Sequence, residues 1–264
     1  MTKQKKEFRK SKTVYRFVWG LAKLFYPRIS WVGRENLPEE PCIIVGNHSQ
    51  MNGPIAFELY YPRKRLIWCA SEMMFWKEVP AYAYRDFWSE KPKALQWFYK
   101  LLSYIITPLC VCIFNNADVI PVFRDNRLLK TFRQTMDALS AGTDVIIFPE
   151  CATPYNNIVY QFQENFVDTA RLYYKRTGTA LPFVPTYLCP KRKTIYFGKP
   201  IYFDPSAPIA EERKRICREA MDNITEIAAS LPLHTVIPYR NIPKRRYPKN
   251  LPIEVTENHE NTCG

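Results

Sequence analysis

Two short apolar segments, each followed directly by residues that can carry chemistry, constrain the fold of this chain most strongly. Residues 42–46 (CIIVG) precede Asn47-His48, and residues 145–148 (VIIF) precede Pro149-Glu150. Short continuous apolar runs of this kind are typical of buried strands in a parallel sheet. The histidine is therefore predicted to lie at a strand-to-loop corner, where α/β proteins place functional groups. The glutamate is predicted to follow the second strand and to point across the edge of the sheet.

The remaining segments predict an α/β fold with one mostly parallel central sheet flanked by helices, because strands alternate with helices along the chain. The predicted organisation is a basic amphipathic N-terminal helix (1–28), an α/β domain (29–233) and a basic, proline-rich C-terminal tail (234–264). Further strands are expected at residues 29–32, 65–70, 119–123, 181–188 and 194–197, and helices at 54–61, 128–139 and 216–231.

The formal net charge of +13 predicts an anionic partner. The candidates are nucleic acid, an anionic membrane surface, and a polyanionic cosubstrate such as coenzyme A or acyl carrier protein. Basic clusters without a recognisable binding motif are weak support for nucleic acid, so no nucleic-acid partner is expected. The eight cysteines include no CxxC pair with zinc spacing, and no cleavable signal peptide is visible. A reducing cytoplasmic setting is the expectation.

Two segments suggest contact with a membrane. Apolar residues between positions 14 and 25 recur at helical spacing beside basic residues, which suits a helix lying in an anionic lipid interface. Residues 101–114 carry no charge but contain Pro108, and this stretch is short for a spanning helix. Each segment has an alternative interpretation, a helix packed on the domain and a buried core helix. We expect a peripheral or monotopic protein at the cytoplasmic face of the cell membrane.

The residues themselves favour acid–base chemistry at His48. A neutral imidazole near pH 7 can take a proton from an alcohol as the alcohol attacks an acyl carbon. A histidine of this kind is otherwise a hydrogen-bonded structural residue. Arg124 follows the expected strand at 119–123, where a guanidinium fork suits a phosphate, and Arg127 and Lys130 lie one helical turn further on. The alternative for Arg124 is an ordinary surface arginine.

Three blocks in order, Asn47-His48, residues 119–124 (VIPVFR) and Phe148-Pro149-Glu150, resemble those of PlsC-like glycerophospholipid acyltransferases. The resemblance covers about residues 30–230. It implies that His48 is the general base and that Glu150 positions the acceptor hydroxyl. It also implies that Arg124 binds the acceptor phosphate, and Arg127 could add to the same pocket. The flanking residues implied in substrate binding are Asn47, Phe148 and Pro149.

Two positions depart from the family's blocks. The acid expected five residues after the histidine, which orients the imidazole, is replaced by Gly53. Asn52 could accept a hydrogen bond from the ring instead, and Glu58 or Asp118 could substitute from elsewhere. The glycine, threonine and arginine expected after Glu150 are replaced by residues 151–153 (CAT), so a second phosphate-binding arginine is missing. Cys151 is a conceivable nucleophile, or simply a small loop residue.

The resemblance implies an acyltransferase that moves a fatty acyl group from acyl-CoA or acyl-ACP to a lysophospholipid or glycerol-phosphate-type hydroxyl, in phospholipid synthesis. Catalysis is assigned to His48, Glu150 and Asn52. No metal and no organic cofactor are expected beyond the thioester cosubstrate. The alternative is a catalytically impaired, acyltransferase-like protein that binds lipid.

Overall fold

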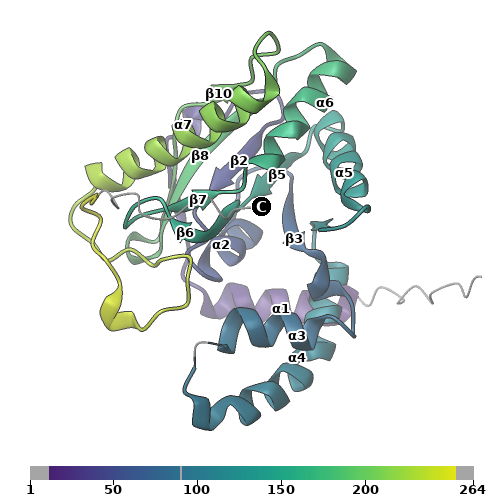
Figure 1. Ribbon diagram of the computed structural model, residues 1–264, viewed down its shortest axis with the longest axis vertical. Coiled ribbons are helices and arrows are strands. Elements are labelled where there is room, and N and C mark those ends of the chain that lie inside the picture. The colour runs from purple at the N-terminus through teal and green to yellow at the C-terminus, as the bar shows by residue number, and fades with distance from the viewer. Residues whose placement is uncertain (1–11, 90, 254–264) are drawn as a thin grey trace, which may run out of the picture. The chain divides into compact units, whose positions relative to one another are not determined.

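A computed structural model describes residues 12–89 and 91–253 of the chain (Figure 1). These residues form two compact units. Among the described residues, the larger unit contains Arg28–Trp68 and residues 122–253, and the smaller contains residues 12–27 and Cys69–Pro121. The sequence had assigned the segment 69–121 to the α/β domain, whereas in the structure it groups with the N-terminal helix. Residues 1–11 of the predicted N-terminal helix and residues 254–264 of the predicted C-terminal tail lie outside the described residues.

The larger unit is built on a mixed sheet with the strand order β1-β9-β8-β2-β5-β3, and β10 pairs with β8. The pairs β1–β9, β8–β2, β2–β5 and β5–β3 are parallel, whereas β9–β8 and β10–β8 are antiparallel. The protein is therefore α/β with a mostly parallel central sheet, as the sequence predicted. The strands are β1 (Ser30–Val32), β2 (Ile43–Gly46), β3 (Arg65–Ala70), β5 (Asp144–Ile147), β8 (Pro182–Cys189), β9 (Thr194–Phe197) and β10 (Ile201–Tyr202).

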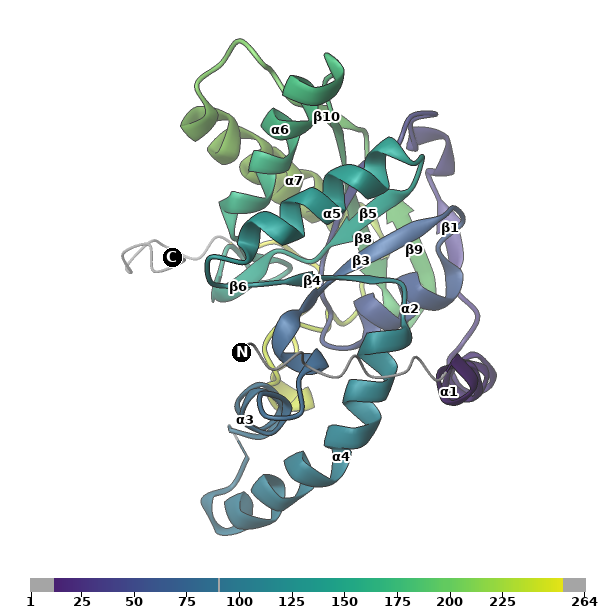
Figure 2. The ribbon, with the colours of Figure 1, turned by 90° about the vertical axis from the view of Figure 1, so that its right-hand side faces the viewer.

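The centre of the sheet is covered on both faces. Every residue of β2, β5 and β8 is buried, which explains why these strands are continuous apolar runs rather than alternating ones. Helices α5 (Leu128–Ser140), α6 (Asp168–Thr177) and α7 (Ile209–Ser230) pack side by side, with α5 against β5 and α7 against β8 (Figure 2). Helix α2 (Asn52–Tyr60) begins directly after the histidine loop.

The sequence analysis did not predict the β6–β7 hairpin or helix α6 of the larger unit. Strand β6 (Glu150–Pro154) pairs with β7 (Tyr160–Phe162) in an antiparallel hairpin, where a loop was expected. The turn of this hairpin is held by Asn156, whose Oδ1 accepts the backbone N–H groups of Ile158 and Val159. Helix α6 escaped prediction because its sequence, DTARLYYKRT, is mostly polar and gives a weak apolar pattern.

The C-terminal segment is not a detached tail within the described residues, because its two ends are joined. The backbone N–H of His234 donates to Oδ1 of Asn250 at 2.7 Å, and Thr235 forms a β-bridge with Lys249. The Asn250 amide also donates to the carbonyl of Ala228 in α7 at 2.8 Å. We call residues 234–250, which lie within the yellow segment of Figure 1, the C-terminal loop. These contacts are the physical reason why this segment folds against the larger unit. No pattern in the sequence predicted them.

The smaller unit is helical. Helix α1 (Lys12–Phe25) packs on α4 (Gln96–Asn116), and α3 (Val79–Ala83) continues into a π-helical turn at Tyr84–Trp88. Its core is formed by Val79, Ala83 and Val111. Strand β4 (Val119–Val122) then carries the chain to the larger unit.

Helix α4 runs without a break through Pro108, although the sequence analysis treated this proline as an interruption. The described residues contain one helix, Lys93–Asn116, that is long and apolar enough to cross a membrane by length and composition. Only 17% of its most apolar window is buried, so it is not the core helix offered as an alternative. Its exposed large apolar side chains are Leu95, Trp97, Phe98, Leu101, Tyr104, Ile105 and Leu109.

Candidate functional site

The register of the sheet brings the predicted histidine and glutamate together. Strands β2 and β5 are parallel neighbours, with Val45 opposite Ile147. His48 comes three residues after Val45, and Glu150 comes three residues after Ile147. The two segments therefore leave the sheet at the same edge and at matching positions along their strands. The backbone N–H of His48 donates to Oε2 of Glu150 at 2.5 Å, which joins the two loops directly.

Glu150 holds backbone groups with both of its carboxylate oxygens. Oε2 accepts the N–H of His48, and Oε1 accepts the N–H of Tyr160 in β7 at 3.0 Å. The side chain is buried, and this burial raises the pKa of Glu150 from 4.5 to about 7, against the opposing effect of the two N–H donors. In this arrangement the glutamate fixes the histidine corner to the β6–β7 hairpin.

The ring of His48 is oriented by a backbone carbonyl. Its Nδ1 is hydrogen-bonded to the carbonyl oxygen of Gln50. A carbonyl can only accept, so Nδ1 carries the proton and the neutral ring keeps its lone pair on Nε2. Ser49 and Gln50 have φ angles of 46° and 57°, in the left-handed region that residues other than glycine rarely adopt. This turn folds the Gln50 carbonyl back onto the ring, and strained backbone of this kind is concentrated at functional sites.

Gly53 closes the same turn and has no room for a side chain. Its N–H donates to the His48 carbonyl at 3.0 Å. A Cβ atom at this position would lie 2.6 Å from the His48 carbonyl oxygen, 2.9 Å from Cε1 of Phe148 and 3.0 Å from the Asn47 carbonyl oxygen. An aspartate at position 53 is therefore incompatible with this backbone, and the Gln50 carbonyl takes the orienting position at Nδ1.

The other proposed orienting residues are engaged differently. The Asn52 side-chain amide donates to the carbonyl of Ser49 at 2.9 Å and so helps to close the turn. The hydrogen-bond partner of His48 Nδ1 is the Gln50 carbonyl. Glu58 forms an ion pair with Arg65 at 2.8 Å. The sequence analysis considered only side chains as partners of the His48 ring. It did not predict Gln50, because every residue has a backbone carbonyl and the residue type therefore gives no signal.

Asn47 is a clamp between strands. It is buried, its Nδ2 donates to the carbonyl of Leu188 at 3.1 Å, and its Oδ1 accepts the Leu188 N–H at 2.7 Å. Nδ2 also donates to Oγ of Ser49 at 2.9 Å. Asn47 therefore ties the histidine loop to the end of β8.

Aromatic rings surround the imidazole. The ring centres of Phe148 and Tyr239 lie 5.3 Å and 5.7 Å from that of His48, both edge to face, with interplanar angles of 67° and 83°. This desolvation lowers the pKa of His48 from 6.5 to about 4, which the Gln50 carbonyl only partly counteracts. The imidazole is neutral at pH 7. Pro149 is buried, and its carbonyl accepts the N–H of Gln163 at 2.9 Å.

The two proposed phosphate-binding arginines lie in the loop that leads into α5. Arg124 is exposed. The guanidinium of Arg127 forms an ion pair with Asp125 at 2.7 Å and lies 4.4 Å from the centre of the Phe123 ring. Arg127 is thus already paired with a carboxylate, and both side chains of the pair are about half exposed.

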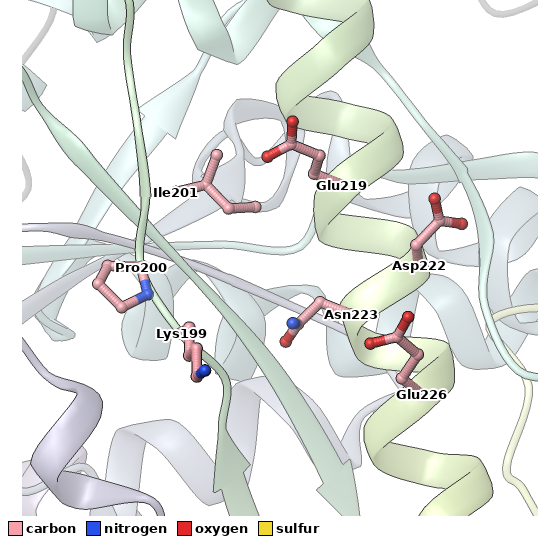
Figure 3. A pocket seen from close by; sticks show the side chains of 7 residues that line it. All are labelled: Lys199, Pro200, Ile201, Glu219, Asp222, Asn223 and Glu226. Atoms are coloured by element: carbon pink, nitrogen blue, oxygen red, sulfur yellow. The ribbon is translucent and has the colours of Figure 1, made fainter.

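A pocket of about 410 Å³ lies elsewhere, between α7 and the segment that leads into β10 (Figure 3). Four of its residues come from α7 and three from the segment after β9, and neither His48 nor Glu150 is among them. Within residues 12–89 and 91–253, no group of three His, Cys, Asp or Glu side chains is placed to hold a metal ion. The pocket residues are Lys199, Pro200, Ile201, Glu219, Asp222, Asn223 and Glu226.

Comparison with known proteins shows a likeness in structure but none in sequence. No protein-family model matches the chain, and no curated protein sequence matches it. Among solved structures, the 1-acyl-sn-glycerophosphate (LPA) acyltransferase PlsC from Thermotoga maritima is similar to this chain, with 16% identity and a TM-score of 0.46. The similarity covers 85% of this chain and 86% of the other. At this level of similarity, the function has to be argued from the residues of the site.

Proposed function

We propose that the protein is an acyltransferase that moves a fatty acyl group from acyl-CoA or acyl-ACP to the hydroxyl of a lysophospholipid or glycerol-phosphate-type acceptor. The observation that carries the proposal is the geometry of His48. Its Nδ1 is occupied by the Gln50 carbonyl, so the neutral ring offers Nε2 as a base. The ordered sequence blocks that resemble PlsC-like acyltransferases supply the reaction class.

In the proposed reaction, Nε2 of His48 takes the proton of the acceptor hydroxyl while the hydroxyl oxygen attacks the thioester carbonyl carbon. The C–S bond of the resulting tetrahedral intermediate then breaks, and the departing thiolate receives the proton back from Nε2. The thioester is already activated, so no covalent enzyme intermediate is needed. The Gln50 carbonyl carries no full charge, so it stabilises the imidazolium less than a carboxylate would. No cofactor is needed beyond the cosubstrate.

Glu150 has a positioning role in this proposal. Its two bonds to the His48 and Tyr160 backbones keep the base at the edge of the sheet. Because each carboxylate oxygen has more than one lone pair, a further bond to the acceptor hydroxyl is also compatible with these contacts. The loop with Arg124 is proposed to contribute to binding of the acceptor phosphate.

We also propose that the smaller unit binds the cytoplasmic face of an anionic membrane, as a peripheral or monotopic element. Helix α1 exposes Phe17, Leu24 and Phe25 at fractions of 67%, 74% and 80%. Apolar side chains so exposed on a basic amphipathic helix favour insertion at a lipid interface. The exposed aromatic and aliphatic side chains of α4 support the same proposal.

One observation favours the second candidate, a lipid-binding protein with impaired catalysis. A histidine with a pKa of about 4 is a weaker base than one near 7, and no carboxylate is among the bonds to its Nδ1. In this second candidate, the strained turn at Ser49 and Gln50 would serve lipid binding and not catalysis.

The experiment that separates the two candidates is thiol release from palmitoyl-CoA by the purified full-length protein, with and without lysophosphatidic acid. Wild type and His48→Ala are compared. Acceptor-dependent release that His48→Ala lowers by about 10²- to 10⁴-fold supports the acyltransferase. Release at the wild-type rate in the variant refutes His48 as the base. If no acceptor promotes release, even with acyl-ACP as donor, the lipid-binding candidate replaces the enzyme.

A further inference from the structure

The C-terminal loop is closed at its base by contacts between its two ends. Its two ends meet at the His234–Asn250 and Thr235–Lys249 contacts, and the N–H of Val236 donates to the carbonyl of Pro248 at 2.9 Å. Beneath it, Nε2 of His234 is hydrogen-bonded to the hydroxyl of Tyr187 in β8 at 2.9 Å. These contacts fix the base of the loop to the sheet of the larger unit.

The closed loop is anchored to the turn that orients the base. The Gln50 side-chain amide donates to the hydroxyl of Tyr247 at 2.9 Å and to the backbone carbonyl of Arg240 at 3.4 Å. The hydroxyl of Ser49 donates to the carbonyl of Ile237 at 3.3 Å. Both residues of the strained turn are therefore bonded to the C-terminal loop, so the loop and the base form one structural unit.

The loop also places an aromatic ring at the histidine, and the residue that follows this ring is a cation, Arg240. Tyr239 lies with its ring 5.7 Å from His48 and 5.7 Å from Tyr160. Burial raises the pKa of the Tyr160 hydroxyl, while the positive charge of the neighbouring Arg240 acts to lower it. The backbone carbonyl of Arg240 accepts the Gln50 amide, so the residue that carries this charge lies beside the turn that orients the base.

The charge of the loop is entirely positive. Residues 232–253 contain no aspartate or glutamate. The positive charges of the loop are therefore not balanced by any carboxylate within residues 232–253. The basic residues of the loop are Arg240, Lys244, Arg245, Arg246 and Lys249.

We propose that Arg240 binds the phosphate of the acyl acceptor, with Tyr239 covering the base beside it. The inference rests on the proposed acyltransferase function and adds a specificity-determining residue to it. In a glycerol phosphate the reacting hydroxyl and the phosphate are separated by only one or two carbon–carbon bonds. A cation that holds the phosphate must therefore lie beside the base, and a guanidinium fork matches two phosphate oxygens.

The test compares Arg240→Gln with Arg245→Gln in the full-length protein. Both variants remove one positive charge from an exposed side chain of the same loop, but Arg245 lies within the short helical turn Lys244–Arg246 rather than next to Tyr239 in the sequence. Steady-state rates are measured with lysophosphatidic acid or with uncharged monoacylglycerol as acceptor, and with palmitoyl-CoA as donor. Arg240→Gln should raise KM for lysophosphatidic acid by about ten- to a hundredfold, the loss expected for a charge-assisted phosphate contact.

In the expected result, Arg245→Gln leaves that KM unchanged, and neither variant changes the KM for monoacylglycerol or palmitoyl-CoA. An equal rise in the KM for lysophosphatidic acid in both variants would indicate that the basic loop attracts anions in general, and this result would overturn the proposal. A rise in the KM for palmitoyl-CoA alone would assign the arginine to the donor's phosphates, which also overturns it.

A binding measurement keeps the inference separate from the proposed function. If wild type shows no transfer to any acceptor, the acyltransferase proposal fails, and calorimetric titration with sn-glycerol 3-phosphate then decides the inference. Weaker binding by Arg240→Gln than by wild type and Arg245→Gln supports it. Equal binding by all three proteins, or no binding by any of them, overturns it.

Discussion

Gly53→Asp is the most informative substitution, because it restores the residue that the family resemblance expects at this position. If the orienting carboxylate were simply missing, the substitution would increase acyl transfer. The structure predicts the opposite outcome. The Cβ atom of any residue at position 53 would lie 2.6 Å from the His48 carbonyl oxygen and 2.9 Å from the Phe148 ring.

The expected loss of stability follows from the atoms that must shift to admit a Cβ atom at position 53. Overpacking of a tight site costs about 1–3 kcal/mol, and displacing the His48 carbonyl weakens its 3.0 Å bond from the Gly53 N–H, by about 1 kcal/mol. Replacing glycine near the start of a helix offsets this by up to about 1 kcal/mol. The expected net loss of stability is about 2 kcal/mol, or about 4–8 °C in melting temperature for a unit of this size.

The assay is thermal or urea unfolding followed by circular dichroism, together with acceptor-dependent thiol release. Gly53→Ala introduces the same Cβ atom without a carboxylate, so it should lose a similar amount of stability. Gly20→Ala is the matched control, because no atom lies within 4 Å of a Cβ at that position in α1. A Gly53→Asp protein that is as stable as wild type and transfers acyl groups faster would refute the steric argument and the role of the Gln50 carbonyl.

Three further predictions concern pH and the membrane. Glu150 has its pKa raised from 4.5 to about 7, so wild type should lose stability relative to Glu150→Gln as pH rises from 4.5 to 7. A stability difference that is constant with pH in urea unfolding would contradict the burial argument. His48 has its pKa lowered to about 4, so wild type should lose stability relative to His48→Gln as pH falls from 6.5 to 4. The unfolding series at acid pH checks this, and no relative loss would show that the ring is not desolvated. Phe17→Ser combined with Leu24→Ser should weaken binding to anionic vesicles by at least tenfold in a sedimentation assay, because each side chain contributes about 1.5–3 kcal/mol when buried. Leu129→Ser in α5, where the leucine is as exposed as Leu24 at 74%, is the control, and equal binding by all variants would exclude α1 as the membrane contact.

The sequence allowed much of the larger unit to be predicted, since its central strands are continuous apolar runs bounded by polar residues. Strands β3 and β9 have the predicted bounds, and β2 and β5 were predicted to within a residue of each end. The positions of His48 and Glu150 after two of these strands followed from the same local pattern. The β6–β7 hairpin and α6 were missed, because short or polar segments give little periodic signal.

The chain by itself thus determined the α/β class, the positions of its central strands along the sequence, and the position of a histidine and a glutamate after two of them. Only the tertiary structure decided how these residues are held. The Gln50 carbonyl reaches Nδ1 through a left-handed turn, and Gly53 leaves that turn no room for a side chain. The C-terminal loop closes on the same turn although about 190 residues separate Gln50 from Arg240 and Tyr247. Local patterns encode strands and helices through side-chain periodicity, whereas these contacts depend on backbone groups and on distant segments, which leave no periodic trace in the sequence.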